Sequence, residues 1–221
     1  MVQKMYSLMA GEGVDDDRQN PTWVNQPMKP NRDDPYWDYG IPNGPRSDPG
    51  SETGGVGSGF PTDMKTPQLV FKEPLGKLPF PDAIERGRGE LILSDRAKVL
   101  FETLDRDAFE FVAAETTLHN GSAGPKYWLA DVVRFLDALD EKSSKVHVEK
   151  KIIPQTGRVQ RRTYCKRGAE VYRRESIGGA HVFRLLYLPS EIICDEDTAA
   201  AIRRQKLFGL DLVPAGVVDA R

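Results

Sequence analysis

The sequence predicts an α+β fold, and three observations support this prediction. Two segments about 100 residues apart, Gly89–Glu115 and Ser190–Gly216, both read as a strand, a helix and a second strand. Short apolar segments between residues 146 and 188 are separated by turn residues, which is typical of an antiparallel meander. A long stretch rich in Pro and Gly precedes them. We therefore expect an antiparallel sheet meander with two strand–helix–strand units and a long Pro/Gly-rich loop.

The N-terminal part of the chain combines one short strand with this loop. Residues 3–9 alternate weakly between apolar and polar side chains, as a strand does. Twelve of the 16 prolines fall between Pro21 and Pro81. Because proline removes backbone donors and glycine is costly to order, we expect a loop over residues 20–68, most mobile over Gly40–Gly59.

The domain boundary follows from this change in composition. Residues 1–68 hold the N-terminal strand and the loop, and residues 69–221 hold the α+β domain. We expect residues 1–19 to form one compact unit with that domain. A chain of 221 residues fits one large domain or two small intertwined ones.

The two strand–helix–strand units present the same signals in the same order. Each opens with an apolar run, followed by a small residue and an Asp, which suits a helix N-cap because a side-chain oxygen there accepts from free N–H groups. An amphipathic helical face follows in the first unit, whereas the second helix is Ala-rich and is expected to stop at Gly209. Each unit closes with alternating apolar residues. The residues are Leu91, Ile92, Leu93, Ser94, Asp95, Ala97, Leu100, Phe101, Leu104, Phe109 and Phe111 in the first unit, and Ile192, Ile193, Cys194, Asp195, Leu210 and Leu212 in the second.

The segment between the two units is ambiguous at its start. Apolar residues in Tyr127–Val146 fit a helix and nearly fit a strand, so periodicity leaves residues 127–140 undecided. Short strands are expected after it, over Val146–Ile153, Val159–Cys165, Ala169–Arg174 and His181–Leu188.

Composition and charge exclude several classes of protein. The 31 Lys and Arg against 33 Asp and Glu give a formal charge of −2, which argues against a dedicated nucleic-acid binder. No apolar run approaches the roughly 20 residues that span a bilayer. The N-terminus turns acidic without the apolar core of a secretory signal. We expect a cytoplasmic protein whose cysteines, Cys165 and Cys194, stay reduced.

Catalytic patterns are few. The three histidines are far apart and no Cys-x-x-Cys pair occurs, so a sequence-local zinc site is unsupported. Asp140 followed by Glu149 and Lys151 has the order of the acid…acid-x-Lys pattern of metal-dependent nucleases, in which two carboxylates hold a hard cation. Because Glu-x-Lys is common on charged strands, we favour an exposed strand face here.

Two groups of residues are candidate binding surfaces. Trp and Tyr are favoured anchors of protein interfaces, and four of them gather in the Pro/Asp-rich loop; they either bind a partner or pin the loop to its own domain. Residues 141–175 hold 11 Lys and Arg against 4 Asp and Glu. This stretch forms solvated strand faces, meets an acidic protein, or binds RNA with Tyr164 and Tyr172 stacking on bases. The aromatic set is Trp23, Tyr36, Trp37 and Tyr39, and the basic set is Arg158, Arg161, Arg162, Arg173 and Arg174.

Three stretches resemble the eleventh family of immunity proteins of bacterial polymorphic toxin systems. They are ELILSDRAKVLF, then YWLADVVRFLDALDEKS over Tyr127–Ser143, and HVFRLLYLPSEIICDEDTAAAIRRQKLFGLDLVP. The resemblance covers about residues 69–214, with Leu212 where the family pattern usually shows Phe. It favours a strand at the ambiguous segment.

The resemblance implies a non-enzymatic cytoplasmic antidote without cofactor or metal. Such proteins bind a cognate toxin, often one delivered by a type VI secretion apparatus, and would neutralise it by occluding its active site. The quoted motif residues look like scaffold, so the toxin-binding surface is expected elsewhere, first on the aromatic loop and otherwise on the basic face. Neither a membrane nor a nucleic acid is an expected partner. An effector-loading adaptor, a metal-dependent nuclease and an RNA-binding module are the alternatives.

Overall fold

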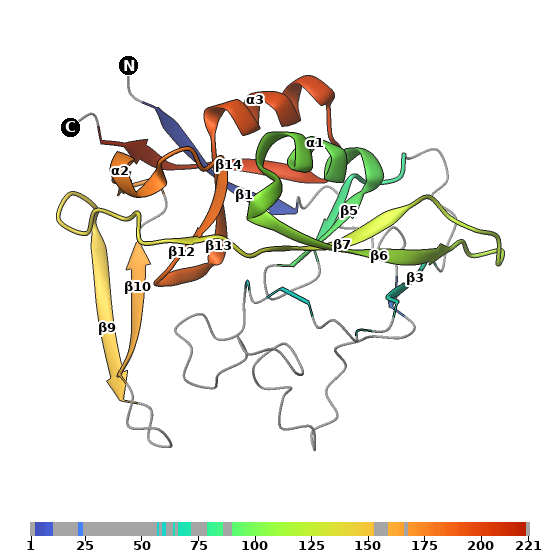
Figure 1. The fold of residues 1–221 in the computed structure, drawn as a ribbon, viewed down its shortest axis with the longest axis horizontal. Helices are drawn as coiled ribbons and strands as arrows, with labels where there is room; N and C mark the ends of the chain where they lie inside the picture. The colour runs from blue at the N-terminus through green and yellow to red at the C-terminus, as the bar shows by residue number, and fades with distance from the viewer. Residues whose placement is uncertain are drawn as a thin grey trace.

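A computed structural model confirms the α+β fold class. It describes residues 3–10, 22–23, 57, 59–60, 64, 66–71, 79–85, 90–152, 159–165 and 168–219. Within these residues most of the regular structure is strand, accompanied by three short α-helices (Figure 1). None of the helices in this part of the chain is long and apolar enough to cross a membrane.

The first six-stranded sheet contains the first predicted strand–helix–strand unit. Its elements are β2 (Thr22–Trp23), β3 (Gln68–Val70), β4 (Ala83–Glu85), β5 (Leu91–Ser94), α1 (Asp95–Asp105), β6 (Phe109–Thr117) and β7 (Tyr127–Val132). The strand order is β2-β3-β6-β7-β5-β4. β7 is antiparallel to both β5 and β6, so the two strands joined by α1 run parallel with β7 between them.

The second six-stranded sheet contains the second unit. Its elements are β1 (Lys4–Ala10), β8 (Phe135–Leu136), β11 (Glu170–Tyr172), β12 (Val182–Leu185), β13 (Leu188–Asp195), α3 (Glu196–Gln205) and β14 (Leu210–Val218). The strand order is β11-β14-β1-β13-β12-β8. β1 is antiparallel to both β13 and β14, which are joined by α3.

The two sheets share one plan, which extends the internal similarity beyond the two predicted units. Five strands in the order β3-β6-β7-β5-β4 correspond to β11-β14-β1-β13-β12. The outer pairs also match: β3 and β11 run parallel to their neighbours, whereas β4 and β12 run antiparallel to theirs. The central strand β7 follows β6 in the chain, but its counterpart β1 comes from the other end of the sequence.

Side chains at equivalent positions cap α1 and α3. The Ser94 Oγ accepts from the Ala97 N–H at 3.3 Å, as predicted. The Asp195 Oδ1 accepts from the Thr198 N–H at 2.9 Å, so Asp195 rather than Cys194 holds the position equivalent to Ser94. The strand β13 runs one residue further than expected, which leaves the Cys194 side chain in the core.

The predicted end of the second helix is also displaced. α3 stops at Lys206, which adopts a left-handed conformation with φ of 51° and closes the last turn. Gly209, with φ of 85°, lies three residues later in the turn that leads into β14. The glycine therefore shapes the turn and not the helix end.

One hydrophobic cluster joins the two units. α1 and α3 lie side by side over the sheets (Figure 1), and the cluster beneath them includes Leu93 and Phe101 from the first unit and Ile192 and Ile202 from the second. Tyr6 of β1 belongs to the same cluster. Two smaller clusters cover the other faces of the sheets.

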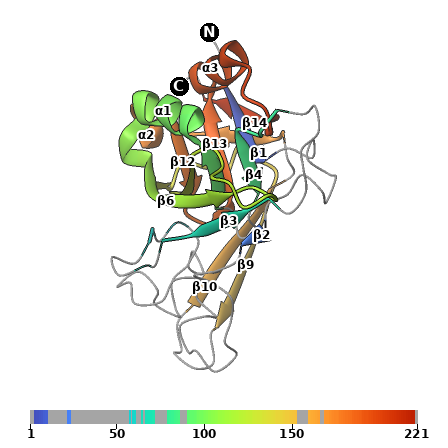
Figure 2. The same ribbon diagram turned by 90° about the vertical axis from the view of Figure 1, so that its right-hand side faces the viewer.

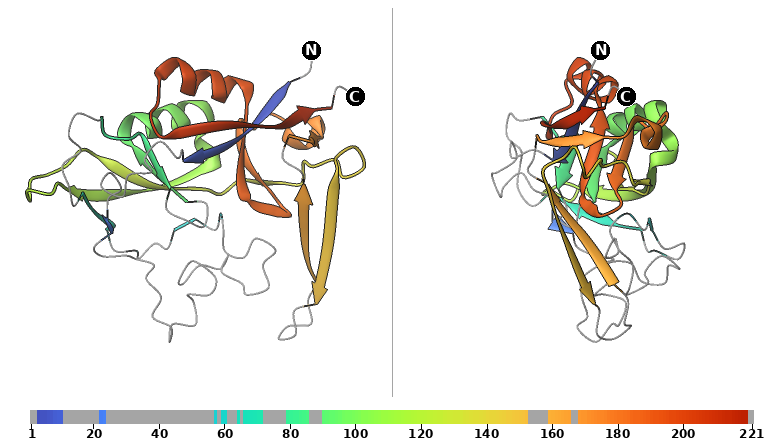
Figure 3. Two further views of the ribbon diagram at one scale, coloured as in Figure 1. Left: turned by 180° about the vertical axis from the view of Figure 1, so that it is seen from behind. Right: turned by 90° about the vertical axis from the view of Figure 1, so that its left-hand side faces the viewer.

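A two-stranded hairpin projects from this body. β9 (Val146–Ile152) and β10 (Val159–Cys165) form a separate antiparallel sheet, which we call the arm (Figures 1, 2 and 3). The expected meander therefore holds only in part: the hairpins β9–β10 and β12–β13 are antiparallel, but β11 pairs in parallel with β14.

The ambiguous segment forms strands β7 and β8, as the family resemblance favoured. The strand expected to end at Arg174 stops at Tyr172, because Arg174–Ile177 forms a short helix, α2. Most of the expected loop over residues 20–68 lies outside the described residues, apart from β2 and a few positions from Gly57 onward.

Candidate functional site

The predicted aromatic anchors lie almost wholly outside the described residues. This holds for Tyr36, Trp37 and Tyr39, and also for Arg158 of the basic set. Trp23 is placed only through its backbone, in β2 beside β3. The aromatic loop therefore stays a prediction.

The remaining basic residues are divided between the arm and the body. Arg161 and Arg162 lie in β10 of the arm. Arg173 follows β11 in the body, where its guanidinium donates to the Asp137 backbone oxygen and pairs with the Asp137 carboxylate at 3.1 Å. Arg174 begins α2. The four described arginines of this set are therefore divided between two parts of the fold and do not form one continuous strand face.

A buried ion pair links the two six-stranded sheets. Arg184 of β12 is fully buried; its Nε donates to the Val132 oxygen at 2.9 Å and its Nη1 to the Pro189 oxygen at 2.8 Å. Its Nη2 lies 3.3 Å from Oδ1 of Asp131 in β7, which is 2% exposed. The other Asp131 oxygen accepts from the Gly59 N–H at 3.0 Å. One carboxylate therefore connects β7, β12 and the Gly-rich segment, so the arginine of the family-like stretch HVFRLLYL is scaffold.

The Gly-rich segment thus has a docking role where it is described. Gly57 and Gly59 are buried and have positive φ values of 70° and 76°. The Phe60 N–H donates to the Glu110 Oε2 at 2.9 Å. The N–H groups of Gly59 and Phe60 therefore already donate to carboxylates of the protein itself, so they do not face the phosphate of a ligand as in a phosphate-binding loop.

A groove of about 720 Å³ opens at the base of the arm. Its wall includes the turn from Asp140 to Ser143, in which the Asp140 Oδ1 accepts from the Lys142 N–H at 2.9 Å and the Oδ2 accepts from the Ser143 hydroxyl at 2.7 Å. The hydroxyl hydrogen bond is the main cause that lowers the pKa of Asp140. Five lining residues are acidic and two are basic: Asp137, Asp140, Glu141, Glu175 and Asp219 against Lys142 and Arg173. The groove is therefore acidic, although the segment around it is basic in sequence.

The nuclease alternative gains no support from this geometry. Both Asp140 oxygens serve their own turn, and Glu149 is an exposed residue of β9 that lies 3.6 Å from His147. Among the described residues, three His, Cys, Asp or Glu side chains come close enough to share an ion only at another place in the fold, and neither acid belongs to that group.

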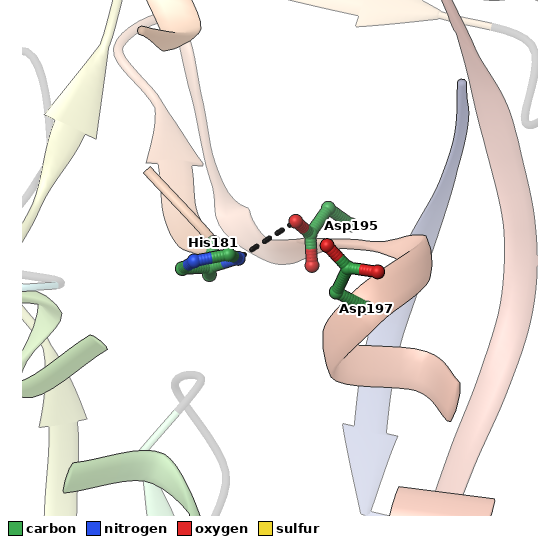
Figure 4. Close-up of side chains that lie close together, drawn as sticks. All are labelled: His181, Asp195 and Asp197. Carbon is green, nitrogen blue, oxygen red and sulfur yellow. Dashed lines mark hydrogen bonds and ion pairs between the residues drawn. The ribbon is translucent and has the colours of Figure 1, made fainter. Parts of the chain in front are cut away.

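That group is His181, Asp195 and Asp197, whose potential ligand atoms all lie within 4.8 Å of one another (Figure 4). The His181 Nδ1 lies 2.8 Å from the Asp195 Oδ2, and the other Asp195 oxygen accepts from Thr198. The three residues line a cavity of about 190 Å³. Since both Asp195 oxygens already have partners and Asp197 is exposed at the helix start, the cluster fits a helix cap better than a metal centre.

The first unit supports this interpretation of the cluster. There the Ser94 hydroxyl donates to the Asp82 carboxylate at 2.6 Å. The Ser94 N–H also donates to the backbone oxygen of Asp82, just as the Asp195 N–H donates to the backbone oxygen of His181. The helix-capping residue and its side-chain partner are therefore Ser94 and Asp82 at α1, and Asp195 and His181 at α3. A hydrogen bond is common to both pairs, whereas a set of metal ligands is not.

Two other candidate groups are buried. Tyr172, proposed as a base-stacking residue, is fully buried in the cluster over the second sheet, so it cannot stack on RNA. Cys194 is fully buried, and burial raises the pKa of its thiol, which removes the thiolate that a nucleophile needs. Both cysteines are free thiols.

Sequence reasoning missed the acidic groove and the partner of Arg184. An arginine inside the apolar run HVFRLLYL is itself a signal, because a buried guanidinium requires a carboxylate or several carbonyl oxygens. Nothing local identifies Asp131 as that carboxylate, since it lies 53 residues earlier.

Comparison with protein families places the chain. The model of the immunity protein family Imm11 matches residues 17–217, which is nearly the whole chain. The chain therefore belongs to the Imm11 immunity protein family, and the resemblance noted in the sequence is confirmed. A search of curated proteins gave no match.

Proposed function

We propose that this chain is a cytoplasmic immunity protein that neutralises a cognate toxin by binding it and occluding its active site. The observation that carries this proposal is the family match over residues 17–217. A toxin delivered by a type VI apparatus and belonging to a polymorphic toxin system is the partner that the family suggests.

The roles of the motif residues support binding without catalysis. Ser94 caps a helix, Asp140 and Ser143 close a turn, and Arg184 holds Asp131 in the core. Each of these groups is used by the scaffold itself. The surface that recognises the toxin is then expected elsewhere.

We propose the arm, the groove at its base and the aromatic loop as the recognition surface. The turn that lines the groove immediately precedes β9, so an acidic hollow and a strand pair rich in Lys and Arg adjoin one another. A partner that covers both must present charges of both signs in matching places. Such complementarity contributes more to specificity and association rate than to affinity. The aromatic residues Trp37 and Tyr39 would supply the anchors.

The test first looks beside this gene for an open reading frame with a toxin-like C-terminus, and it then uses that C-terminal domain. Co-expression of the chain should restore growth to cells that make this domain, and calorimetry should give a stoichiometric complex. Replacing Trp37 and Tyr39 together by Ala should raise the Kd by about 30-fold or more, because the loss of even one aromatic hot spot costs about 2 kcal/mol or more. The far-UV circular dichroism spectrum of this double variant should match that of the wild type, which controls for unfolding.

The outcomes separate the alternatives. If the domain binds but keeps its activity in the complex, the chain is an adaptor rather than an antidote. If growth is not restored and no complex forms, the proposed function is wrong. Unchanged affinity of the Trp37 and Tyr39 variant rejects the loop as the anchor and leaves the other surfaces.

A further inference from the structure

Within the part of the chain that the structure describes, the arm is a sheet of two strands, and the outer edge of β9 pairs with no other strand. The other strand, β10, is tied to the body through the hydrogen bond from the Thr163 N–H to the Tyr187 oxygen at 2.9 Å. All views show the arm extending away from the two large sheets (Figures 1, 2 and 3). Since a lone two-stranded ribbon is marginally stable in water, a third strand would stabilise it.

The direction of the free hydrogen-bonding groups follows from that contact with the body. Thr163 lies opposite Val148, and its N–H points toward the body rather than toward β9. In an antiparallel pair, this makes Thr163 and Val148 a non-hydrogen-bonded pair, and the pattern alternates along the strands. The N–H and C=O groups of Val148, Lys150 and Ile152 therefore face outward from β9. No described residue accepts from or donates to them.

The charges along the arm indicate the kind of strand that fits there. β9 and β10 together contain four basic residues and one acidic residue. The register pairs Glu149 with Arg162 and Lys150 with Arg161. Since opposite charges at neighbouring positions of adjacent strands are favourable, an added strand with an acidic side chain beside the exposed Lys150 would fit this edge.

The exposed positions at this edge agree with an unfilled site. Lys150 is exposed, and Ile152 is 65% exposed, the largest exposed fraction among the large apolar side chains of the described residues. β9 contains no proline or bulge that would block pairing, although its lysines discourage pairing with a copy of itself.

We infer that the free edge of β9 binds an extended, acidic segment of the toxin as a third strand of the arm. Backbone hydrogen bonds to Val148, Lys150 and Ile152 supply the affinity, and the positive face around Lys150 selects the acidic side chains. This inference rests on the proposed function and specifies how the partner is recognised.

The test compares two substitutions at one position. Lys150→Pro removes the charge and the outward N–H, whereas Lys150→Thr removes only the charge. Because proline is tolerated on an edge strand whose N–H faces solvent, the ladder with β10 should survive. Calorimetry with the toxin domain described above should give a higher Kd for Lys150→Thr than for wild type, and a Kd about tenfold higher again for Lys150→Pro.

Hydrogen exchange supplies a second measurement. In the free protein the amides of Glu149 and Lys151, which face β10, should exchange slowly, and those of Val148, Lys150 and Ile152 should exchange fast. Toxin binding should protect the second set. The amides of Glu149 and Lys151 should also stay protected in free Lys150→Pro, which would show that the hairpin is intact. If they lose protection, the inference is tested by whether toxin binding protects the amides of Val148, Lys150 and Ile152 in the wild-type chain.

Several results would overturn the inference. The first is equal toxin affinity of the Pro and Thr variants when the hairpin is intact. The second is that the amides of Val148, Lys150 and Ile152 stay unprotected from exchange in the complex. The third is a wild-type dimer in which these amides already exchange slowly without toxin. In each case a wild-type chain that still binds and neutralises the toxin leaves the proposed function standing. A wild-type chain that does not bind the toxin refutes the proposed function itself.

Discussion

Removing the charge of Arg184 should destabilise the protein more than any surface substitution. Arg184→Met keeps an unbranched apolar stem but leaves the Asp131 carboxylate buried without its cation, and it leaves the Val132 and Pro189 oxygens without their donors. Breaking a buried pair on one side costs about 3–5 kcal/mol. Typical domains have about 5–15 kcal/mol of total stability, so the midpoint of urea unfolding should fall by a large fraction.

The matched control is the double variant Arg184→Met with Asp131→Asn. The amide has no charge to leave uncompensated, and its carbonyl can still accept from the Gly59 N–H. A part of the lost stability should therefore return. A single variant that costs less than about 1 kcal/mol, or a double variant that is no more stable than the single one, would show that the Arg184–Asp131 ion pair does not stabilise the fold as argued.

The stability of Arg184→Met relative to wild type should depend on pH in a defined direction. Burial raises the pKa of Asp131, and Arg184 acts against that rise. Without Arg184 the pKa of the Asp131 carboxyl rises further. At a pH between this raised pKa and the ordinary Asp pKa, Asp131 is then protonated in the folded variant but ionised in the unfolded chain. Stability of the variant then increases relative to wild type as the pH falls from neutral toward the ordinary Asp pKa of about 4. In the double variant, which has no carboxyl at position 131, the stability relative to wild type should not change in this way as the pH falls.

Two other predictions concern the caps and the Gly-rich segment. Ser94→Ala should lower the free energy of unfolding by about 1 kcal/mol, and Asp195→Ala by more, because Asp195 also holds an imidazole; equal losses in urea titrations would contradict the second role. Gly59→Ala should cost more than Gly121→Ala by about 1 kcal/mol, since both have positive φ but only the first places a Cβ against a carboxylate of β6 that holds a backbone N–H. Equal thermal shifts for the two Ala variants would show that only backbone strain is felt.

The elements that local signals define were predictable from the sequence. Ser94 and the apolar spacing after it act within one helical turn, so the sequence placed α1 correctly. The same reasoning failed by one residue at Cys194, because β13 gains its last residue by pairing with β1 and β12 from distant parts of the chain. Gly209 was assigned to the helix end because the sequence does not reveal that Lys206 can take the left-handed conformation.

Strand β7 shows a different limit. It lies between β5 and β6, and almost all of its side chains are buried, so the apolar and polar residues do not alternate. A strand covered on both faces cannot be distinguished from a helix by periodicity. The acidic groove and the free edge of β9 are equally hidden, because each depends on which segments the fold brings together.

The placement of β1 has a consequence for how the protein is made. The first sheet needs only β7, which follows β6 within a few residues, so its core can form while translation continues. The second sheet needs β1 between β13 and β14, and Leu8 pairs with Ile192 and Leu212, roughly 180 to 200 residues away. β1 must therefore wait for β13 and β14, which are synthesised much later. Until Leu210–Val218 has left the ribosome, β1 lacks one of its two neighbours in the second sheet. Because pairings between segments so distant in sequence form slowly, we expect the insertion of β1 to be a slow step of folding.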